Sequence, residues 1–261
     1  NIKIEPDFDK AYFNLANIYN STGKLIDSID VFKDLLKIRP NHPEVLNQLG
    51  VVFLEMDEPE KALFYFKKAS DLDDNIAEIF YNIGNAHYKK HQIKEAKSYY
   101  KKAIKIDPKF ADAYNNLGNI LQEQELFYEA IDMFEKAISI KPDYAEAYYN
   151  YGIACGKLGK EKKAIRLYLQ AVRLKPDYIE AFINLGIIFD EIGDIKKGLT
   201  YHNKVLKLDP KNTQANHNKG FSLLKLGKFK EGWQQYEYRW NTNPANKVKW
   251  PFAREEMWNN E

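Results

Sequence analysis

A column of primary amides is the feature of this sequence best suited to chemistry. In steps of 34 residues the column contains Asn14, Gln48, Asn82, Asn116, Asn150, Asn184 and Asn218. Asparagine inside a helix costs about 0.7 kcal/mol relative to alanine, so helix propensity does not explain its recurrence. Each amide carries a hydrogen-bond donor and an acceptor, as the backbone of an extended peptide does. The column therefore predicts a site that holds a polypeptide by its backbone.

The positions beside the amide column vary more. One residue before it stand Phe13, Asn47, Tyr81, Asn115, Tyr149, Ile183 and His217. Three residues after it stand Asn17, Val51, Asn85, Asn119, Ile153, Ile187 and Phe221. From these neighbours we take Tyr81, Asn85, Asn119 and Tyr149 as further candidate peptide contacts. The mixture of polar and aromatic side chains is expected to set specificity.

Two alternatives to a binding role for the amide column stay open. The amides can hydrogen-bond across to adjacent helices and stiffen the array, and repeated duplication can preserve a column that has no present use. Substitution of Asn116 and Asn150 by alanine separates the hypotheses. Weaker binding with little change in melting temperature favours a binding role, whereas unfolding favours stiffening.

The sequence contains no recognisable catalytic, cofactor or metal site. It lacks a glycine-rich phosphate loop, a paired-cysteine zinc signature and a nucleophile elbow. His87 and His91 have the i, i+4 spacing of a metal pair, but no third ligand is in register, so we expect a satisfied, partly buried His87. Cys155 is expected to be a small buried thiol. We therefore predict no catalytic residue, no metal and no cofactor.

The elements that position the amides follow from a period of 34 residues without insertions. Proline stands at seven of eight equivalent positions: Pro6, Pro40, Asp74, Pro108, Pro142, Pro176, Pro210 and Pro244. A small residue recurs at Ala16, Gly50, Gly84, Gly118, Gly152, Gly186 and Gly220. A ring recurs at Phe32, Phe66, Tyr100, Phe134, Tyr168, His202 and Tyr236. A small residue facing a ring allows two helices to pack closely.

The unit from Ala111 to Tyr144 shows how the period divides into two helices. Apolar and small residues at i, i+3, i+4 and i+7 from Tyr114 share one face of a first helix. Ala130, Phe134 and Ala137 share a face of a second helix, which ends before Pro142 because proline cannot continue a helix. The sequence therefore predicts one antiparallel helix pair in each period.

Turn and start signals accompany the pairs. Gly23, Gly159, Gly193 and Gly227 mark turns where a positive φ is favoured by glycine. Three acidic or amide residues each precede a glutamate by three positions, which is the spacing of a capping box. These pairs are Asn41 with Glu44, Asp143 with Glu146, and Asp177 with Glu180.

A 34-residue period with these columns resembles the tetratricopeptide repeat. The resemblance implies an all-α fold, a right-handed α-solenoid superhelix of antiparallel helix pairs, with the first helix of each pair on the concave side. The expected units are 9–42, 43–76, 77–110, 111–144, 145–178, 179–212 and 213–246. Residues 1–8 are expected to be the tail of a preceding repeat, so that the chain is part of a longer array, and residues 247–261 a C-terminal cap or junction segment.

One known subtype of this family does not fit. The dicarboxylate-clamp domains, which hold chaperone tails, need cationic groove residues early in each first helix. The corresponding positions here are Lys10, Glu44, Glu78, Asp112, Glu146, Glu180 and Gln214. Since five of the seven are acidic, the sequence argues against a clamp of that kind.

A closer resemblance suggests an alternative function. The segment DAYNNLGN, residues 112–119, together with the amide column resembles the repeat domain of O-linked N-acetylglucosamine transferases, in which the column holds the backbone of protein substrates. The stretch from Gly227 to Trp240 resembles the last repeat of bacterial proteins that continue into a glycosyltransferase-like domain. We therefore expect a non-catalytic protein-interaction scaffold; the alternative is the substrate-recognition arm of a larger glycosyltransferase.

Composition restricts the partners. The chain has 39 Lys and Arg against 37 Asp and Glu, so its net charge of +2 demands neither nucleic acid nor an anionic membrane. The one cysteine excludes an internal disulfide, is compatible with a reducing compartment, and leads us to expect a cytoplasmic protein. We expect an extended protein or peptide as partner. Self-association is a further hypothesis, through a tryptophan-rich end that contains Trp233, Trp240, Trp250 and Trp258.

Overall fold

The computed structural model describes residues 6–236, with side chains from Lys10 onward. All regular structure in this range is helical, which confirms the expected all-α class of paired helices for the described part of the chain. The expectations for residues 1–5, for the segment 247–261, and for Arg239, Trp240, Trp250 and Trp258 lie outside the described residues. None of the helices described is long and apolar enough to span a membrane.

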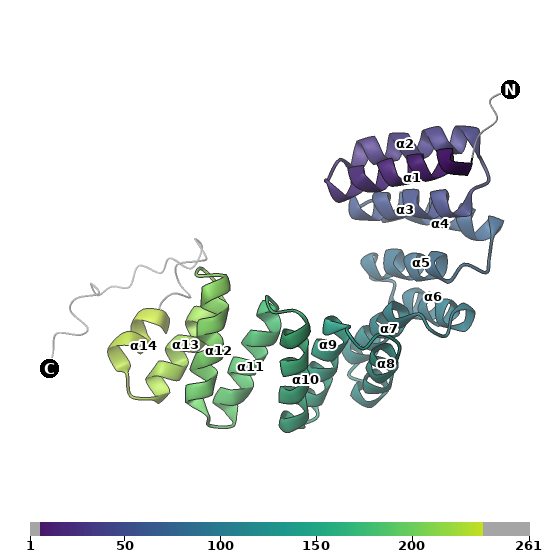
Figure 1. Ribbon diagram of the computed structural model, residues 1–261. Helices are drawn as coiled ribbons and strands as arrows, with labels where there is room; N and C mark the ends of the chain where they lie inside the picture. The colour runs from purple at the N-terminus through teal and green to yellow at the C-terminus, as the bar shows by residue number, and fades with distance from the viewer. Residues whose placement is uncertain (1–5, 237–261) are drawn as a thin grey trace. The chain divides into compact units, whose positions relative to one another are not determined.

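The helices form two compact units, divided after Pro142. Unit one contains α1 (Pro6–Ser21), α2 (Leu25–Ile38), α3 (Pro43–Glu55), α4 (Pro59–Leu72), α5 (Ala77–Lys89), α6 (Ile93–Ile106), α7 (Ala111–Glu123) and α8 (Phe127–Ile140). Unit two contains α9 (Ala145–Lys157), α10 (Glu161–Leu174), α11 (Ile179–Glu191), α12 (Ile195–Leu208), α13 (Thr213–Lys225) and α14 (Phe229–Tyr236) (Figure 1). The first helix begins at Pro6, three residues before the expected start of its unit at Asp9.

Within each unit, every helix packs on its own partner, and the second helix of a pair packs on the first helix of the next pair. In unit one, α3 packs on α4, α4 on α5, and α5 on α6; α3 also touches α5 directly. In unit two, α11 packs on α12 and α12 on α13, and α11 also touches α13. The odd-numbered first helices therefore lie beside one another within a unit, which is what brings their amide columns together.

The close crossing of each pair depends on glycine. A Cβ atom added at Gly84 would lie 2.6 Å from the ring of Tyr100, and one at Gly118 would lie 2.6 Å from the ring of Phe134. Real Cβ atoms do not approach other atoms so closely, so only glycine allows these rings to pack against the backbone of the first helix. The expected contact between the small column and the ring column is confirmed at these pairs.

The turns inside the pairs share one backbone conformation. Gly23, Gly159, Gly193 and Gly227 have φ between 66° and 86°, as expected. The same position in the other three pairs holds Asp57, His91 and Glu125, with φ of 63°, 59° and 59°. These three residues adopt the left-handed region without being glycine, which the sequence pattern did not predict.

The expected capping boxes are wrong. Helices α3, α9 and α11 begin after His42, Tyr144 and Tyr178, and none of the three starts has a side-chain cap. At α11 the start follows the ring: Tyr178 packs on Tyr149 with ring centroids 4.9 Å apart, and the helix begins at the next residue. At none of these three starts does the expected capping box form, and at α11 the residue before the helix is held by ring packing instead.

Candidate functional site

The seven amides of the column lie on the seven first helices, one on each. In chain order they are Asn14 on α1, Gln48 on α3, Asn82 on α5, Asn116 on α7, Asn150 on α9, Asn184 on α11 and Asn218 on α13. Asn14 is exposed and Asn82 is only 6% exposed, while the other five are half-buried. The column therefore borders the surface of each unit rather than the centre of its core.

In unit one, Asn82 and Asn116 donate from their amide nitrogens to the preceding pair, whereas Gln48 Nε2 donates to Glu78 of the following pair at 3.3 Å. Asn82 Nδ2 donates to Asn47 Oδ1 at 3.0 Å. Asn116 Nδ2 donates to the Tyr81 hydroxyl at 3.2 Å and to Asn85 Oδ1 at 3.1 Å. The structure thus joins four predicted site residues, Asn82 with its neighbours Tyr81 and Asn85 on α5, and Asn116 on α7, into one polar stripe.

Unit two repeats part of this arrangement. Asn184 Nδ2 lies 3.4 Å from the Tyr149 hydroxyl and 3.5 Å from the Tyr168 hydroxyl. Asn218 Nδ2 is buried and has no hydrogen-bond partner among the described residues. Asn119, on α7 of unit one, is half-buried and takes no part in either set of hydrogen bonds.

These hydrogen bonds bear on the alternatives for the column. The bonds that the stiffening hypothesis needs are present in both units, because amide nitrogens of one pair reach the pair before it. Among the described residues, no donor reaches Asn82 Oδ1 or Asn184 Oδ1. At Asn82 and Asn184 the end of the amide that stays available for a guest is therefore the carbonyl oxygen, rather than both ends as the sequence suggested. The oxygen of Asn116 already accepts from Asn115 at 3.4 Å.

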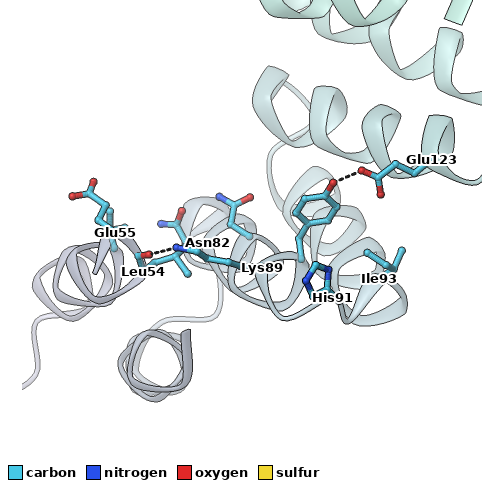
Figure 2. Close-up of a pocket in the computed structure, with 10 residues that line it drawn as sticks. Leu54, Glu55, Asn82, Lys89, His91, Ile93 and Glu123 are labelled. Atoms are coloured by element: carbon cyan, nitrogen blue, oxygen red, sulfur yellow. Dashed lines mark hydrogen bonds between the residues drawn. The ribbon is translucent and has the colours of Figure 1, made fainter. Parts of the chain in front are cut away.

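A hollow of about 800 Å³ lies along α5, between α3 and α7. Figure 2 shows the residues that line it, which are Val51, Leu54, Glu55, Asn82, Asn85, Tyr88, Lys89, His91, Ile93 and Glu123. Its volume falls in the range of about 300–1,000 Å³ that is usual for ligand sites. The hollow therefore contains two of the predicted contacts, Asn82 and Asn85, with several residues that were not predicted.

Two sets of contacts border this hollow, one on its α7 side and one on its α3 side. The Tyr88 hydroxyl donates to the carboxylate of Glu123, and burial together with Glu123 raises the pKa of Tyr88 to about 12, so the phenol stays protonated at neutral pH. Lys89 Nζ donates to the Leu54 carbonyl at 2.8 Å (Figure 2). Lys89 also pairs with Asp57 at 2.9 Å. Lys89 lies seven residues after Asn82 and Tyr88 three residues after Asn85, so helical periodicity carried the signal that could have identified them.

A second hollow, of about 420 Å³, lies where α5 and α7 begin. It shares Asn82 with the first hollow and contains the predicted contact Tyr81. The ring of Tyr81 packs on that of Phe110, with centroids 4.9 Å apart. The groove along the first helices of unit one therefore runs from an aromatic and acidic beginning to the Tyr88–Glu123 end.

Cys155 and His87 are both part of the packed structure rather than of a reactive site. Cys155 is fully buried, as expected. His87 is half-buried, its Nδ1 lies 2.7 Å from Gln92 Oε1, and its ring stacks on Tyr99, so it is a satisfied structural histidine. No cluster of three or more potential metal ligands occurs in the described part of the chain.

A buried Asp, His and Ser cluster in unit two escaped sequence reasoning. His202 Nε2 lies 3.0 Å from Asp190 Oδ2, and the Ser222 hydroxyl donates to the same oxygen at 2.5 Å. A nucleophilic triad requires serine to hydrogen-bond the histidine, but here both bond the carboxylate. All three are buried, and His202 fills the ring position of its pair, so the cluster joins α11, α12 and α13 as part of the core.

The comparisons with known proteins agree with the geometry. Three models described as tetratricopeptide repeat match residues 7–75 and 110–177, residues 77–110, and residues 179–212. No curated protein matches the chain in sequence. Among solved structures, MamA is 29% identical, with a TM-score of 0.53 over 62% of this chain and 94% of MamA.

Two further structures share the fold. YrrB, described as a TPR protein with an unusual peptide-binding site, is 23% identical, with a TM-score of 0.57 over 72% of this chain and 97% of YrrB. PilF from Pseudomonas aeruginosa is 18% identical, with a TM-score of 0.68 over 74% of this chain and 88% of PilF.

Proposed function

The chain belongs to the tetratricopeptide-repeat family, and from that premise we propose that it is a non-catalytic scaffold that binds an extended polypeptide segment along its first helices. The observation that carries the proposal is the hollow of about 800 Å³ along α5, which Asn82 and Asn85 help to line. A groove of this kind is long in the direction of the array and suits a chain rather than a compact ligand.

The hydrogen bonds within the column support a specific mode of binding. Asn82 and Asn184 are each fixed by their nitrogen on the preceding pair, which leaves the carbonyl oxygen as an acceptor. Backbone N–H groups of an extended guest would donate to these oxygens. Because the amides are already ordered in the free protein, little side-chain entropy is lost on binding, and preorganisation of this kind raises affinity. Stiffening and binding are thus two uses of the same side chains.

A precedent within the fold agrees with this proposal. YrrB is described as having an unusual peptide-binding site, which is a property of that protein. The fold that it shares with this chain is therefore compatible with peptide binding, while the residues that would make contact here are argued from this chain alone.

The proposal is tested with a phage-displayed library of random linear peptides, selected on the whole chain. Asn116→Ala and Asn184→Ala are then measured against the selected peptides by fluorescence anisotropy. A hydrogen bond contributes about 0.5–1.5 kcal/mol, so each variant is expected to bind about 2- to 10-fold more weakly. Asn203→Ala makes the same change at an exposed position of the second helix α12 and is expected to bind like wild type.

Thermal melting of each variant completes the test. Asn116→Ala loses two inter-pair bonds, so a modest fall in stability is expected together with the loss of affinity. If folded Asn116→Ala and Asn184→Ala bind the selected peptides as tightly as wild type does, the amides serve the array alone and the proposal is wrong. Failure to select any peptide would also count against it.

The alternative function rests on the sequence between Gly227 and Trp240. In the described part of that motif, Gly232 is buried and packs against Leu224. Trp233 packs edge-on against Tyr236. Arg239 and Trp240 lie outside the described residues. A recognition arm of a larger glycosyltransferase requires a catalytic domain encoded after Glu261. A reading frame that closes shortly after this residue would exclude the alternative.

A further inference from the structure

The smaller hollow of unit one has the composition of a cation site. We call it the carboxylate cup and define it by Glu78, Tyr81, Asn82, Asp107, Phe110 and Asp112. Its three carboxylates make no ion pair with any described lysine, arginine or histidine. Glu78 accepts from the amides of Asn47 and Gln48, and Asp107 accepts from the backbone of Lys109. The cup therefore combines three uncompensated negative charges with two packed rings.

The side-chain oxygen of Asn82 also lines the cup. Asn82 is only 6% exposed, and its nitrogen is used by Asn47 at 3.0 Å. Its Oδ1 receives no hydrogen bond from the described residues. This oxygen can therefore accept a hydrogen bond from a donor that a guest brings.

Unit two contains a second version of the cup, 68 residues further along the chain. Its residues are Glu146, Tyr149, Asn150, Lys175, Tyr178 and Glu180. The rings of Tyr149 and Tyr178 lie 4.9 Å apart, the same separation as Tyr81 and Phe110 in unit one. Burial is the main cause that raises the pKa of the Tyr178 phenol, and Glu146, Tyr149 and Glu180 raise it further. Carboxylates therefore lie near this ring too.

The two cups differ in one charge. Lys175 stands where unit one has Asp107, and Lys175 Nζ lies 4.7 Å from the centroid of the Tyr178 ring. Unit two therefore supplies its own cation to the aromatic and acidic site. Unit one has two packed rings and two carboxylates at the same positions, but it holds a third acid, Asp107, where unit two has the lysine.

Resting on the proposed function, we propose that the carboxylate cup binds the guanidinium of an arginine in the guest segment. Arginine fits better than lysine because its planar fork can pair with two carboxylate oxygens and stack on an aromatic face at once. Glu78 and Asp112 supply the carboxylates, Tyr81 and Phe110 the rings, and Asn82 Oδ1 accepts a guanidinium or backbone N–H. The groove therefore selects extended segments that carry arginine.

Acidic residues in the first turn of a helix also compensate the helix dipole, and Glu78 and Asp112 do so on α5 and α7. That role does not account for the paired rings. One pair earlier the equivalent positions keep an acid at Glu44 but hold Asn47 and Ile76 in place of the two rings. Glu44→Gln is therefore a matched control, because it removes a first-turn charge where no cup exists.

The test uses peptides selected on the whole chain as described above, resynthesised with citrulline in place of arginine. Citrulline keeps the shape of arginine and loses its charge. We expect the selected peptides to contain arginine and the citrulline forms to bind wild type at least about 10-fold more weakly, since bonds between charged groups contribute about 1.5–3 kcal/mol. Asp112→Asn is expected to lose a similar factor and Glu44→Gln to change little.

Asp107→Lys is the variant that tests the cup most directly. It gives unit one the lysine that unit two has at Lys175, in a turn that already accepts lysine there, so folding is preserved. We expect this variant to bind arginine peptides at least about 10-fold more weakly and to lose the preference for arginine over citrulline.

The outcomes separate the two proposals. Selected peptides that bind without a basic residue, or that tolerate citrulline, overturn the arginine cup and leave the groove function intact. Selected peptides that depend on arginine but bind Asp107→Lys and Asp112→Asn normally place the arginine elsewhere and also overturn it. If no peptide is selected at all, both proposals fail.

Discussion

Single tyrosines connect the core of this protein to its groove. Tyr100 occupies the ring position against Gly84, and its hydroxyl donates to Asn85 Oδ1 at 2.8 Å, at the edge of the amide stripe. Tyr168 occupies the same position in unit two and lies 3.5 Å from Asn184. In three other pairs the position holds phenylalanine, at Phe32, Phe66 and Phe134, so the ring serves packing and the hydroxyl is an addition that orients groove amides.

Burial of this hydroxyl predicts a dependence of stability on alkaline pH. Burial raises the pKa of Tyr100 well above the ordinary value of 10.0. Below about pH 10 the phenol is protonated in both folded and unfolded states, so its contribution is fully present. Above that pH the unfolded chain releases the proton first, and the contribution is lost. We expect Tyr100→Phe to be about 1 kcal/mol less stable than wild type near neutral pH, because it loses one hydrogen bond.

The order of stability is expected to reverse near about pH 11, where wild type loses the protonated phenol and Tyr100→Phe has no proton to lose. Urea unfolding followed by circular dichroism at both pH values measures the effect. Tyr128→Phe is the control, because Tyr128 is 66% exposed and loss of its hydroxyl changes little that is buried. A difference between wild type and Tyr100→Phe that stays constant with pH would contradict the argument.

Helix pairs depend on a turn that forces one residue into the left-handed region. Glycine meets this demand in four turns, but Glu125 meets it between α7 and α8 with φ of 59°. An L-residue in this region costs about 1–2 kcal/mol, part of which is offset because glycine loses more entropy on folding. We therefore expect Glu125→Gly to raise the free energy of unfolding by about 0.5–1 kcal/mol, measured by urea denaturation.

Asp57→Gly is the informative comparison. It relieves the same backbone strain at positive φ but removes the ion pair with Lys89, so the increase in the free energy of unfolding is expected to be smaller. Equal stabilisation by both substitutions would mean that the Asp57–Lys89 pair contributes nothing. A loss of stability in Glu125→Gly would show that the turn favours the glutamate for a reason other than backbone conformation.

At the scale of elements, periodicity carried most of the prediction. The column through Gly118 and Phe134 correctly paired α7 with α8, because a small residue and a ring in fixed phase leave few other ways to pack. Helix starts were predicted less well. The signal of Asp177 with Glu180 is local, whereas the start of α11 follows the packing of Tyr178 on Tyr149, which depends on the preceding pair.

The site was predicted in position but not in detail. The column placed Asn82 and Asn116 on neighbouring first helices, as its spacing implied. Which end of each amide is used depends on the axial offset between neighbouring pairs, which brings Asn116 Nδ2 to Tyr81 and Asn85. No pattern within a single helix encodes that offset. The cup was missed for a related reason, since Phe110 and Tyr81 come from a loop and a helix 29 residues apart.

In the molecule as a whole, contacts within each unit are made between neighbours in the chain. In unit one, α2 packs on α3, α4 on α5, and α6 on α7. Stability is then approximately the sum of the pairs and of the interfaces between adjacent pairs. A stretch with enough pairs is expected to be stable without the rest, and about three repeats suffice in such arrays.

This additivity predicts that residues 1–142, which contain the four pairs of unit one, fold alone. The isolated fragment is expected to be helical by circular dichroism, to unfold cooperatively in urea, and to protect the amides of α3–α6 from hydrogen exchange as the whole chain does. A shorter fragment, residues 1–124, removes α8 and with it the ring of Phe134 that packs against Gly118. Its α7 should lose protection while α3–α6 keep theirs, because only the terminal interface is missing. A 1–142 fragment that is unfolded, or a 1–124 fragment whose protection is lost uniformly, would show that the array is held together by more than its neighbouring pairs.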